Sequence, residues 1–178
     1  MSALRVADAG DLFLTSVSPE LRIVPGRVED VPAILALIKA LAEYERLADH
    51  VVATEDGLTR WLFGDRPAAE VVIAWAGDEP VGFALFFHNF STFLGRPGLY
   101  LEDLFVEPEW RGRGVGRRLL SHLAAIAMER GCGRFEWAVL DWNEAAIAFY
   151  RRMGAVVLED WRVCRVTGEA LATLASLA

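Results

Sequence analysis

The sequence predicts an α/β domain built on a mixed, mostly antiparallel sheet flanked by helices. Apolar residues recur at helical spacing between positions 31 and 47, whereas the run VVIAWAGDEPVGFALFF (71–87) holds two β-rich segments around Gly-Asp-Glu-Pro. Such a hairpin pairs neighbouring strands in antiparallel fashion, which excludes a purely parallel doubly wound sheet. The 178 residues are 54% hydrophobic, enough for one domain with its own core. We expect an N-terminal extension over 1–20 and a single domain over 21–178.

The first half is predicted to contain a strand, a long helix and a short helix before the hairpin, at 21–27, 31–47 and 55–63. Asp30 is placed to cap the long helix, which carries Pro32 in its first turn, and Thr54 is placed to cap the short one. After the hairpin, FSTFLGRPG is predicted to be a loop because it is rich in glycine, proline and serine.

The second half is predicted to alternate strands and helices, at 99–108, 115–130, 134–141, 143–152, 155–166 and 168–177. Pro108 ends the first of these strands, and Gly131 follows the first helix in the position that favours a left-handed residue. Asn143 is placed to cap the next helix, and the segment 155–166 reads as one or two strands.

Composition and charge restrict the class of function. The formal net charge of −7 disfavours a nucleic-acid binder and suits a cationic substrate. No apolar run reaches the length of a membrane span, and the N-terminus lacks the apolar core of a secretory signal, so we expect a cytoplasmic protein. Cys132 and Cys164 have no CxxC spacing, and the three histidines lie far apart. We therefore expect neither a disulfide framework nor a metal site.

The segment WRGRGVGRRLL (110–120) concentrates positive charge in an acidic chain, with four arginines and three glycines in positions 111–118. It lies between a predicted strand and a predicted helix, whose first N–H groups have no internal partner and favour an anion. The P-loop pattern is absent, and the third glycine comes one position too early for a dinucleotide fingerprint. An RGG-type RNA segment is usually repeated and disordered, whereas this one occurs once in a structured pattern. A solvated turn with surface arginines is the plain structural alternative.

Arg111-x-x-Gly114-x-Gly116 matches the (Gln/Arg)-x-x-Gly-x-(Gly/Ala) motif of the GNAT acetyltransferases. IKALAEYERL, YLEDLFVEPEWRGRGVG, VLDWNEAAIAFYRRMGA and GEA together resemble the spermidine/spermine and thialysine acetyltransferase group of that superfamily, over roughly 21–170. The resemblance implies the GNAT fold, acetyl-coenzyme A as donor, no metal, and commonly a homodimer.

The resemblance also implies which residues hold the coenzyme. The pyrophosphate is expected at the backbone of the motif, and the pantetheine arm along the strand before it. Asn143 and the turn after it are expected to touch the coenzyme as well. The implied coenzyme residues are Leu104, Phe105, Val106, Arg111, Gly112, Arg113, Gly114, Val115, Gly116, Arg117, Asn143 and Ala146.

Two adjacent acids interrupt the apolar strand LYLEDLFV, where carboxylates are costly unless paired or used. Alternation places Glu102 on the face of Tyr100 and Leu104, and Asp103 on the face of Leu101 and Phe105. Pairing with arginines near the strand end is the structural alternative. The resemblance favours Glu102 as the acceptor of the amine proton, directly or through water, and an acceptor site at Glu102 and Asp103.

Tyr150 is the acid that the resemblance implies for the leaving thiolate. It lies two helical turns after Asn143 in AIAFY, where an ordinary buried tyrosine is the alternative. Tyr44 and Glu45 match positions that line the acceptor site, with a solvated helix end as their alternative. With Glu102, Asp103 and Asp141 they would form an acidic cavity.

The expected substrate is a small basic amine, either a thialysine- or lysine-like amino acid or a short diamine. Polyamine-acetylating relatives carry an aspartate in the loop before YLED, where this chain has Ser91. FSTFLGR, VLDWN and GEA resemble the thialysine branch instead. The alternatives are a polyamine or protein N-acetyltransferase and a non-catalytic acyl-coenzyme A module. No nucleic-acid or membrane partner is expected.

Overall fold

The computed structural model describes residues 20–178. The extension predicted over 1–20 therefore falls almost wholly outside the described residues. The chain divides into two compact units, of which the first ends at Trp137 and the second covers Ala138–Ala178. Each unit is described by itself, and the single domain expected over 21–178 stays a prediction.

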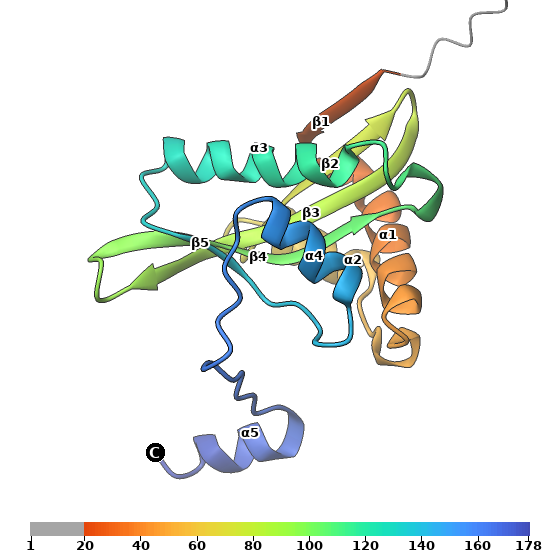
Figure 1. Ribbon diagram of the computed structural model, residues 1–178. Coiled ribbons are helices and arrows are strands. Elements are labelled where there is room, and N and C mark those ends of the chain that lie inside the picture. The colour runs from red at the N-terminus through yellow and green to blue at the C-terminus, as the bar shows by residue number, and fades with distance from the viewer. Residues whose placement is uncertain (1–19) are drawn as a thin grey trace, which may run out of the picture. The chain divides into compact units, whose positions relative to one another are not determined.

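The first unit is built on a five-stranded sheet in the order β1-β2-β3-β4-β5 (Figure 1). The strands are β1 (Leu21–Pro25), β2 (Glu70–Ala76), β3 (Glu79–Ser91), β4 (Arg96–Val106) and β5 (Phe135–Trp137). Neighbouring strands are antiparallel except for β4 and β5, which are parallel. The predicted mixed, mostly antiparallel sheet is thus confirmed.

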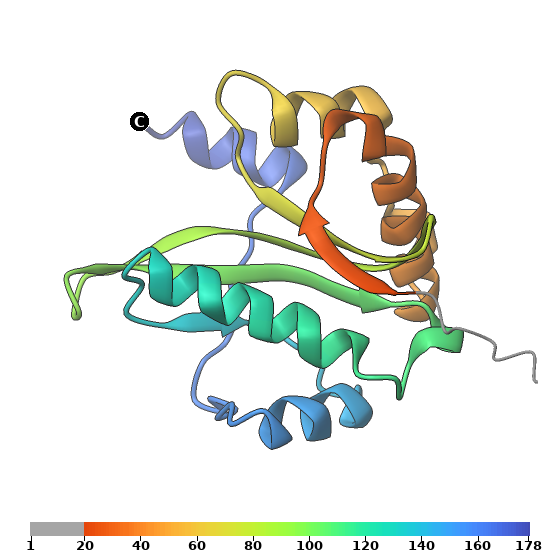
Figure 2. The ribbon, with the colours of Figure 1, turned by 90° about the horizontal axis from the view of Figure 1, so that it is seen from above.

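Helices cover both faces of this sheet. Figure 2 shows α1 (Val31–Tyr44) and α2 (Glu55–Phe63) on one face and α3 (Val115–Glu129) on the other. The apolar positions at helical spacing explain this arrangement, since they give α1 and α3 one buried stripe each. The core under α1 and α2 contains Ile34, Leu37, Leu41, Leu62, Val71, Ile73, Phe83 and Phe105.

The predicted helix limits hold with small differences. Thr54 caps α2, because its Oγ1 accepts a hydrogen bond of 3.1 Å from Gly57 N–H. Asp30 precedes α1 but does not cap it with its side chain, which instead accepts from Arg27 N–H at 2.8 Å. Helix α1 ends at Tyr44, three residues before the predicted end, so Tyr44 and Glu45 lie at its C-terminus.

The segment FSTFLGRPG was wrongly predicted to be a loop throughout. Strands β3 and β4 stay paired as far as Ser91 and Arg96, so the connection is only residues 92–95, with Gly95 at φ 61°. Glycine and proline are compatible with strand ends when the ladder does not require their missing groups, which the sequence pattern alone does not reveal. The long hairpin extends past the end of α3 (Figures 1 and 2).

The second unit contains α4 (Glu144–Arg152) and α5 (Gly168–Ala175). Two strand predictions fail near or within it. The strand expected over 134–141 is limited to the three residues of β5, and the segment 155–166 forms no strand. Alternating apolar residues report a propensity, but a strand also needs a neighbour for its peptide groups, and within the described chain 155–166 has none. Val156, Trp161 and Val163 are accordingly exposed.

Candidate functional site

A β-bulge in β4 shapes the centre of the site. Phe86 pairs with Leu101 and Leu85 pairs with Asp103, so Glu102 is an extra residue without a partner in β3. Because Leu85 and Phe86 point to opposite faces, Asp103 and Leu101 also lie on opposite faces of the sheet. The predicted alternation, which placed Asp103 with both Leu101 and Phe105, is therefore wrong about Leu101, because the bulge shifts the pattern by one residue.

At the bulge, the side chain of Asp103 interacts electrostatically with those of Glu102 and Glu45. These three carboxylates are called the acidic cluster. Burial, and then the nearby charges of Glu102 and Glu45, together raise the pKa of Asp103 to about 6. Burial also raises the pKa of Glu45 above its usual value. Glu102 itself is exposed, at a strand position whose neighbours are half-buried or buried. A cluster of this kind attracts a cation and contains one carboxyl that can hold a proton near neutral pH.

Beyond the bulge, one edge of β4 has no paired strand within the first unit. Strand β5 pairs only with Leu99, Tyr100 and Leu101. Glu107 N–H donates to Val81 O at 3.0 Å, so the peptide groups of Phe105 and Glu107 are directed to β3. The groups of Leu104 and Val106 then point to the side that β5 has left. An extended ligand with amide groups can add to such an edge as another strand would.

The glycine-rich loop follows this edge and leads into α3. Gly112 and Gly114 adopt φ of 74° and 83°, the left-handed region that glycine enters without strain. Within the described residues, the backbone N–H groups of 112–117 donate to no protein acceptor, and the first helical bond is Arg118 N–H to Gly114 O. The loop thus presents a row of free donors at the positive end of a 15-residue helix, which is an arrangement that binds anions.

The side chain of Arg111 is exposed, but it contacts both β4 and α1. Its Nε–H donates to Val106 O at 2.9 Å, and its guanidinium lies 4.3 Å from the centre of the Tyr44 ring. The Phe105 ring is 5.6 Å away on the strand side. Arg111 therefore connects the end of β4, the glycine-rich loop and the end of α1. Sequence reasoning missed this contact, because no local signal relates positions 44 and 111.

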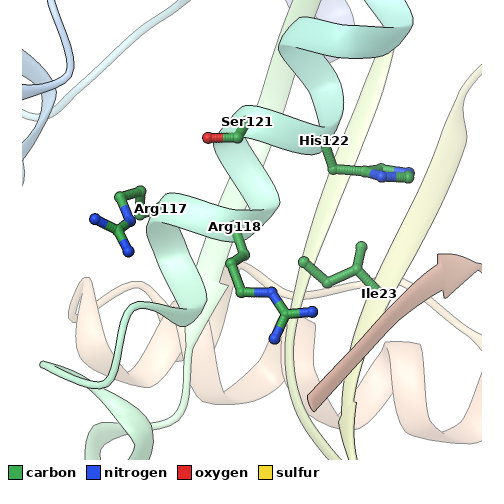
Figure 3. Close-up of a pocket in the computed structure, with 5 residues that line it drawn as sticks. All are labelled: Ile23, Arg117, Arg118, Ser121 and His122. Carbon is green, nitrogen blue, oxygen red and sulfur yellow. The ribbon is translucent and has the colours of Figure 1, made fainter.

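The other arginines of the segment differ in their surroundings. The Arg113 guanidinium lies 4.8 Å from the Trp110 ring, and Arg118 donates to Leu21 O at 2.8 Å. A hollow of about 360 Å³ on this side of the unit is lined by Ile23, Arg117, Arg118, Ser121 and His122. Figure 3 shows Arg118 and His122 on the side of α3 that faces Ile23, with Arg117 on the other side. Arg117 and Arg118 add positive charge beside the loop.

Three predicted site residues lie in the second unit. Asn143 caps α4, with its Oδ1 accepting from Ala146 N–H at 3.2 Å, as its position in the sequence predicts. Tyr150 is buried in α4, and its ring lies 5.3 Å from that of Phe149. Tyr150 and Asn143 lie two turns apart on the same helix, which agrees with their expected common face.

The structure thus gathers the predicted residues of the first unit. Glu45 acts electrostatically on Asp103 beside the bulge, and Tyr44 stacks on Arg111 at the start of the donor-rich loop. None of the described helices is both long enough and apolar enough to cross a lipid bilayer. Among residues 20–178, no group of three or more His, Cys, Asp or Glu side chains is arranged to hold a metal ion.

Comparison with known proteins gives consistent results. Residues 35–155 match the acetyltransferase (GNAT) family. The chain is 40% identical to the thialysine N-epsilon-acetyltransferase of Sus scrofa over 157 residues, which cover 82% of this chain and 92% of that protein. It is 35% identical to an L-ornithine N5-acetyltransferase of Arabidopsis thaliana, over 83% of this chain and 85% of that protein.

Similarity to solved structures agrees with these relatives. An integron cassette protein from the mobile metagenome of V. cholerae superimposes with a TM-score of 0.73 at 28% identity, covering 87% of this chain and 97% of that one. The family match spans both the glycine-rich loop and α4. From the bulged strand, the open edge, the loop of free N–H groups and these matches, we conclude that the chain belongs to the GNAT family and is an N-acetyltransferase.

Proposed function

We propose that the chain transfers the acetyl group of acetyl-coenzyme A to the terminal amine of a small basic amino acid, of the thialysine, lysine or ornithine type. The observation that carries the proposal is the acidic cluster beside the open edge of β4, with Asp103 at a pKa of about 6. The two relatives described above are named for terminal amines of amino acids, which supports the choice of substrate. A short diamine is the second candidate.

The donor is proposed to lie along β4 and end at the glycine-rich loop. The free N–H groups of 112–117 would hold the pyrophosphate, and the peptide groups of Leu104 and the N–H of Val106 would pair with the pantetheine amides, since Val106 O already accepts from Arg111. A strand N–H near Leu104 would polarise the thioester carbonyl as charge develops on its oxygen. Phe105 contributes differently, because its side chain is buried and its peptide groups are directed to β3. Asn143 and Ala146 are assigned to the coenzyme by the family resemblance.

The acceptor must lose a proton before it attacks. An alkyl ammonium has a pKa of about 10.4, so forming the neutral amine at pH 7 costs about 4.6 kcal/mol. An ordinary aspartate is a weak base for this task, whereas the pKa of Asp103, about 6, lies closer to that of the amine. We propose that the proton of the acceptor ammonium group passes to the pair Glu102 and Asp103. The family resemblance implies that Glu102 receives it, directly or through water.

The leaving thiolate needs a proton, and Tyr150 is proposed to supply it. A phenol has a pKa of about 10, and a thiol has a pKa of about 8.5. Proton transfer from the phenol to the thiolate is therefore unfavourable by only a small free energy. Tyr150 is buried, so most of its side chain is shielded from bulk water. We further propose a cytoplasmic homodimer, as the resemblance to the family suggests.

The proposal is tested by following thiol release from acetyl-coenzyme A with thialysine, lysine, ornithine, putrescine, spermidine and a short peptide. We expect kcat/KM to be highest for one of the three amino acids. Highest activity with spermidine or with the peptide would replace the substrate assignment. Binding of the coenzyme without turnover of any amine would favour the non-catalytic module.

A further inference from the structure

An ion pair at β5 lies on the same face of the sheet as Asp103, and the proposed reaction gives it no role. Arg134 Nε lies 2.8 Å from Glu136 Oε2. We propose that this pair binds the amino-acid end of the acceptor, with Glu136 taking the α-ammonium group and Arg134 taking the α-carboxylate. This inference rests on the proposed function, because it concerns the other end of the same substrate.

The strand register places Glu136 near Asp103. Asp103 pairs with Leu85 of β3. Two residues further along β3, Phe87 pairs with Tyr100, so Asp103 and Tyr100 share a face despite the bulge. Tyr100 in turn pairs with Glu136 of β5. Glu136 therefore lies about 7 Å along the strands and about 5 Å across them from Asp103.

Two further contacts agree with this placement. Asn89 lies on the same face as Phe87, two residues before it, and its Nδ2 donates to Glu136 Oε2 at 3.0 Å. Opposite Asn89 stands Gly98, where a Cβ would lie 2.3 Å from Asn89 Oδ1 and 3.0 Å from Arg134 Cγ. The missing side chain at Gly98 thus gives Asn89 and Arg134 the space to lie against the sheet on the Asp103 face.

Part of each charged group in this ion pair is free for a ligand. The side chains of Arg134 and Glu136 are 36% and 33% exposed. Within residues 20–178, Glu136 Oε1 accepts no hydrogen bond, and the Nη1 and Nη2 groups of Arg134 donate none. An α-amino acid carries a cation and an anion on one carbon, so each of its charges can meet the opposite charge of a fixed pair. Because the pair is already ordered, binding costs little side-chain entropy.

The surface between the two ends suits the chain of the acceptor. Leu85 and Phe87 are half-buried on this face, between Asp103 and the ion pair. Their apolar surface favours the methylene groups of an ornithine or lysine side chain. With the terminal ammonium group at the acidic cluster, the α-carbon would reach Glu136 and Arg134. A diamine would bring an ammonium group beside Arg134 without a carboxylate to offset it, which costs affinity.

The structural alternative is that the ion pair only fixes β5 to the hairpin of β3 and β4. The two roles predict different kinetics. A structural contact lowers Tm and affects every acceptor by the same factor. A contact with the substrate affects only the acceptors that carry the matching charge.

The experiment compares ornithine with two compounds that each lack one of its groups: putrescine lacks the α-carboxylate, and δ-aminovalerate lacks the α-amino group. In Arg134→Gln, we expect kcat/KM to fall about tenfold for ornithine and δ-aminovalerate, mainly through KM, whereas putrescine keeps its value or gains. In Glu136→Gln, kcat/KM should fall about tenfold for ornithine and putrescine, whereas δ-aminovalerate keeps its value or gains.

The matched controls are Arg130→Gln and Glu70→Gln. Arg130 and Glu70 also form an ion pair, but Arg130 lies over the Phe86 ring, on the opposite face of the sheet from Phe87. Neither control should change the ratios of kcat/KM among the three acceptors. The KM for acetyl-coenzyme A should stay unchanged in all four variants.

Several results would overturn the proposal. These are unchanged ratios in Arg134→Gln and Glu136→Gln, or a loss by the same factor for all three acceptors. If Arg134→Gln does not fold, Arg134→Lys keeps a positive charge beside Glu136 without the planar fork, and it must still lower the ratio of ornithine to putrescine. Calorimetric binding of the three compounds to the wild type and the variants gives the same comparison without turnover. Ornithine binding that depends on Arg134 and Glu136, without turnover of any acceptor by the wild type, would refute the proposed function alone.

Discussion

Replacing Asp103 by asparagine should make the protein more stable at neutral pH and much less active. The pKa of Asp103 rises from 3.8 to about 6 in the folded protein, chiefly because the carboxyl is buried and then because Glu102 and Glu45 are close. Folding therefore favours the protonated acid, and asparagine keeps its shape without its charge. If the carboxylate takes part in amine deprotonation, kcat/KM should fall by about 100-fold to 10,000-fold.

The pH dependence of this effect has a definite sign. Between the unfolded and folded values of the Asp103 pKa, the folded state binds more protons than the unfolded state, so stability falls as the pH rises. The carboxylate then costs up to about 3 kcal/mol above pH 6, and nothing well below pH 4. Thermal unfolding should give similar Tm values for Asp103→Asn and the wild type at about pH 3. At about pH 8, the Tm of the variant should be higher. A variant that is less stable than the wild type at the higher pH would contradict this account.

Glu102→Gln serves as the comparison for Asp103→Asn. Glu102 is exposed, so its loss should change Tm little. Its charge helps to raise the pKa of Asp103, so removing it should shift the acidic limb of the kcat/KM profile to lower pH. If the acidic limb of the kcat/KM profile lies at the same pH in both variants as in the wild type, neither carboxyl group determines its position.

Replacing Tyr150 by phenylalanine should lower kcat by about 100-fold or more, because the thiolate then leaves without its proton donor. The ring of Tyr150 is buried, and phenylalanine fills the same space, so the variant should fold. Thiol release under saturating acetyl-coenzyme A and amine measures kcat, and circular dichroism checks the fold. Tyr100→Phe is the matched control, since Tyr100 also packs on an aromatic ring, that of Phe87 at 5.1 Å. A folded Tyr150→Phe protein with full turnover would remove Tyr150 from the mechanism.

Much of the architecture follows from local pattern. The helical spacing of apolar residues, with capping residues, predicted the bounds of α1, α2, α3 and α4 to within a few residues. This works because each helix has one apolar stripe, and the helix must turn that stripe towards the core. Gly77 and Asp78 marked the turn between β2 and β3 for a similar reason. The glycine-rich loop was recognisable from its residues and from its place between a strand and a helix.

Other features depend on contacts far apart in the chain. The bulge at Glu102 is visible only in the register with β3, since alternation within β4 gives no sign of an extra residue. The stacking of Arg111 on Tyr44 joins positions that no sequence motif connects. The exposed run 155–166 has the alternation of a strand, but alternation does not supply a neighbouring strand. Local propensity therefore located the elements, and long-range pairing determined the chemistry of the acceptor site.

The position of the acetyl group in the product tests the central claim most directly. Ornithine and carbon-13-labelled acetyl-coenzyme A are incubated with the enzyme, and the product is examined by nuclear magnetic resonance and mass spectrometry. The account predicts one added acetyl group, bound as an amide to the terminal nitrogen, because the acidic cluster attracts the cationic end of the side chain. An acetyl group on the α-nitrogen, or no amide product while thialysine and lysine are also left unchanged, would contradict it.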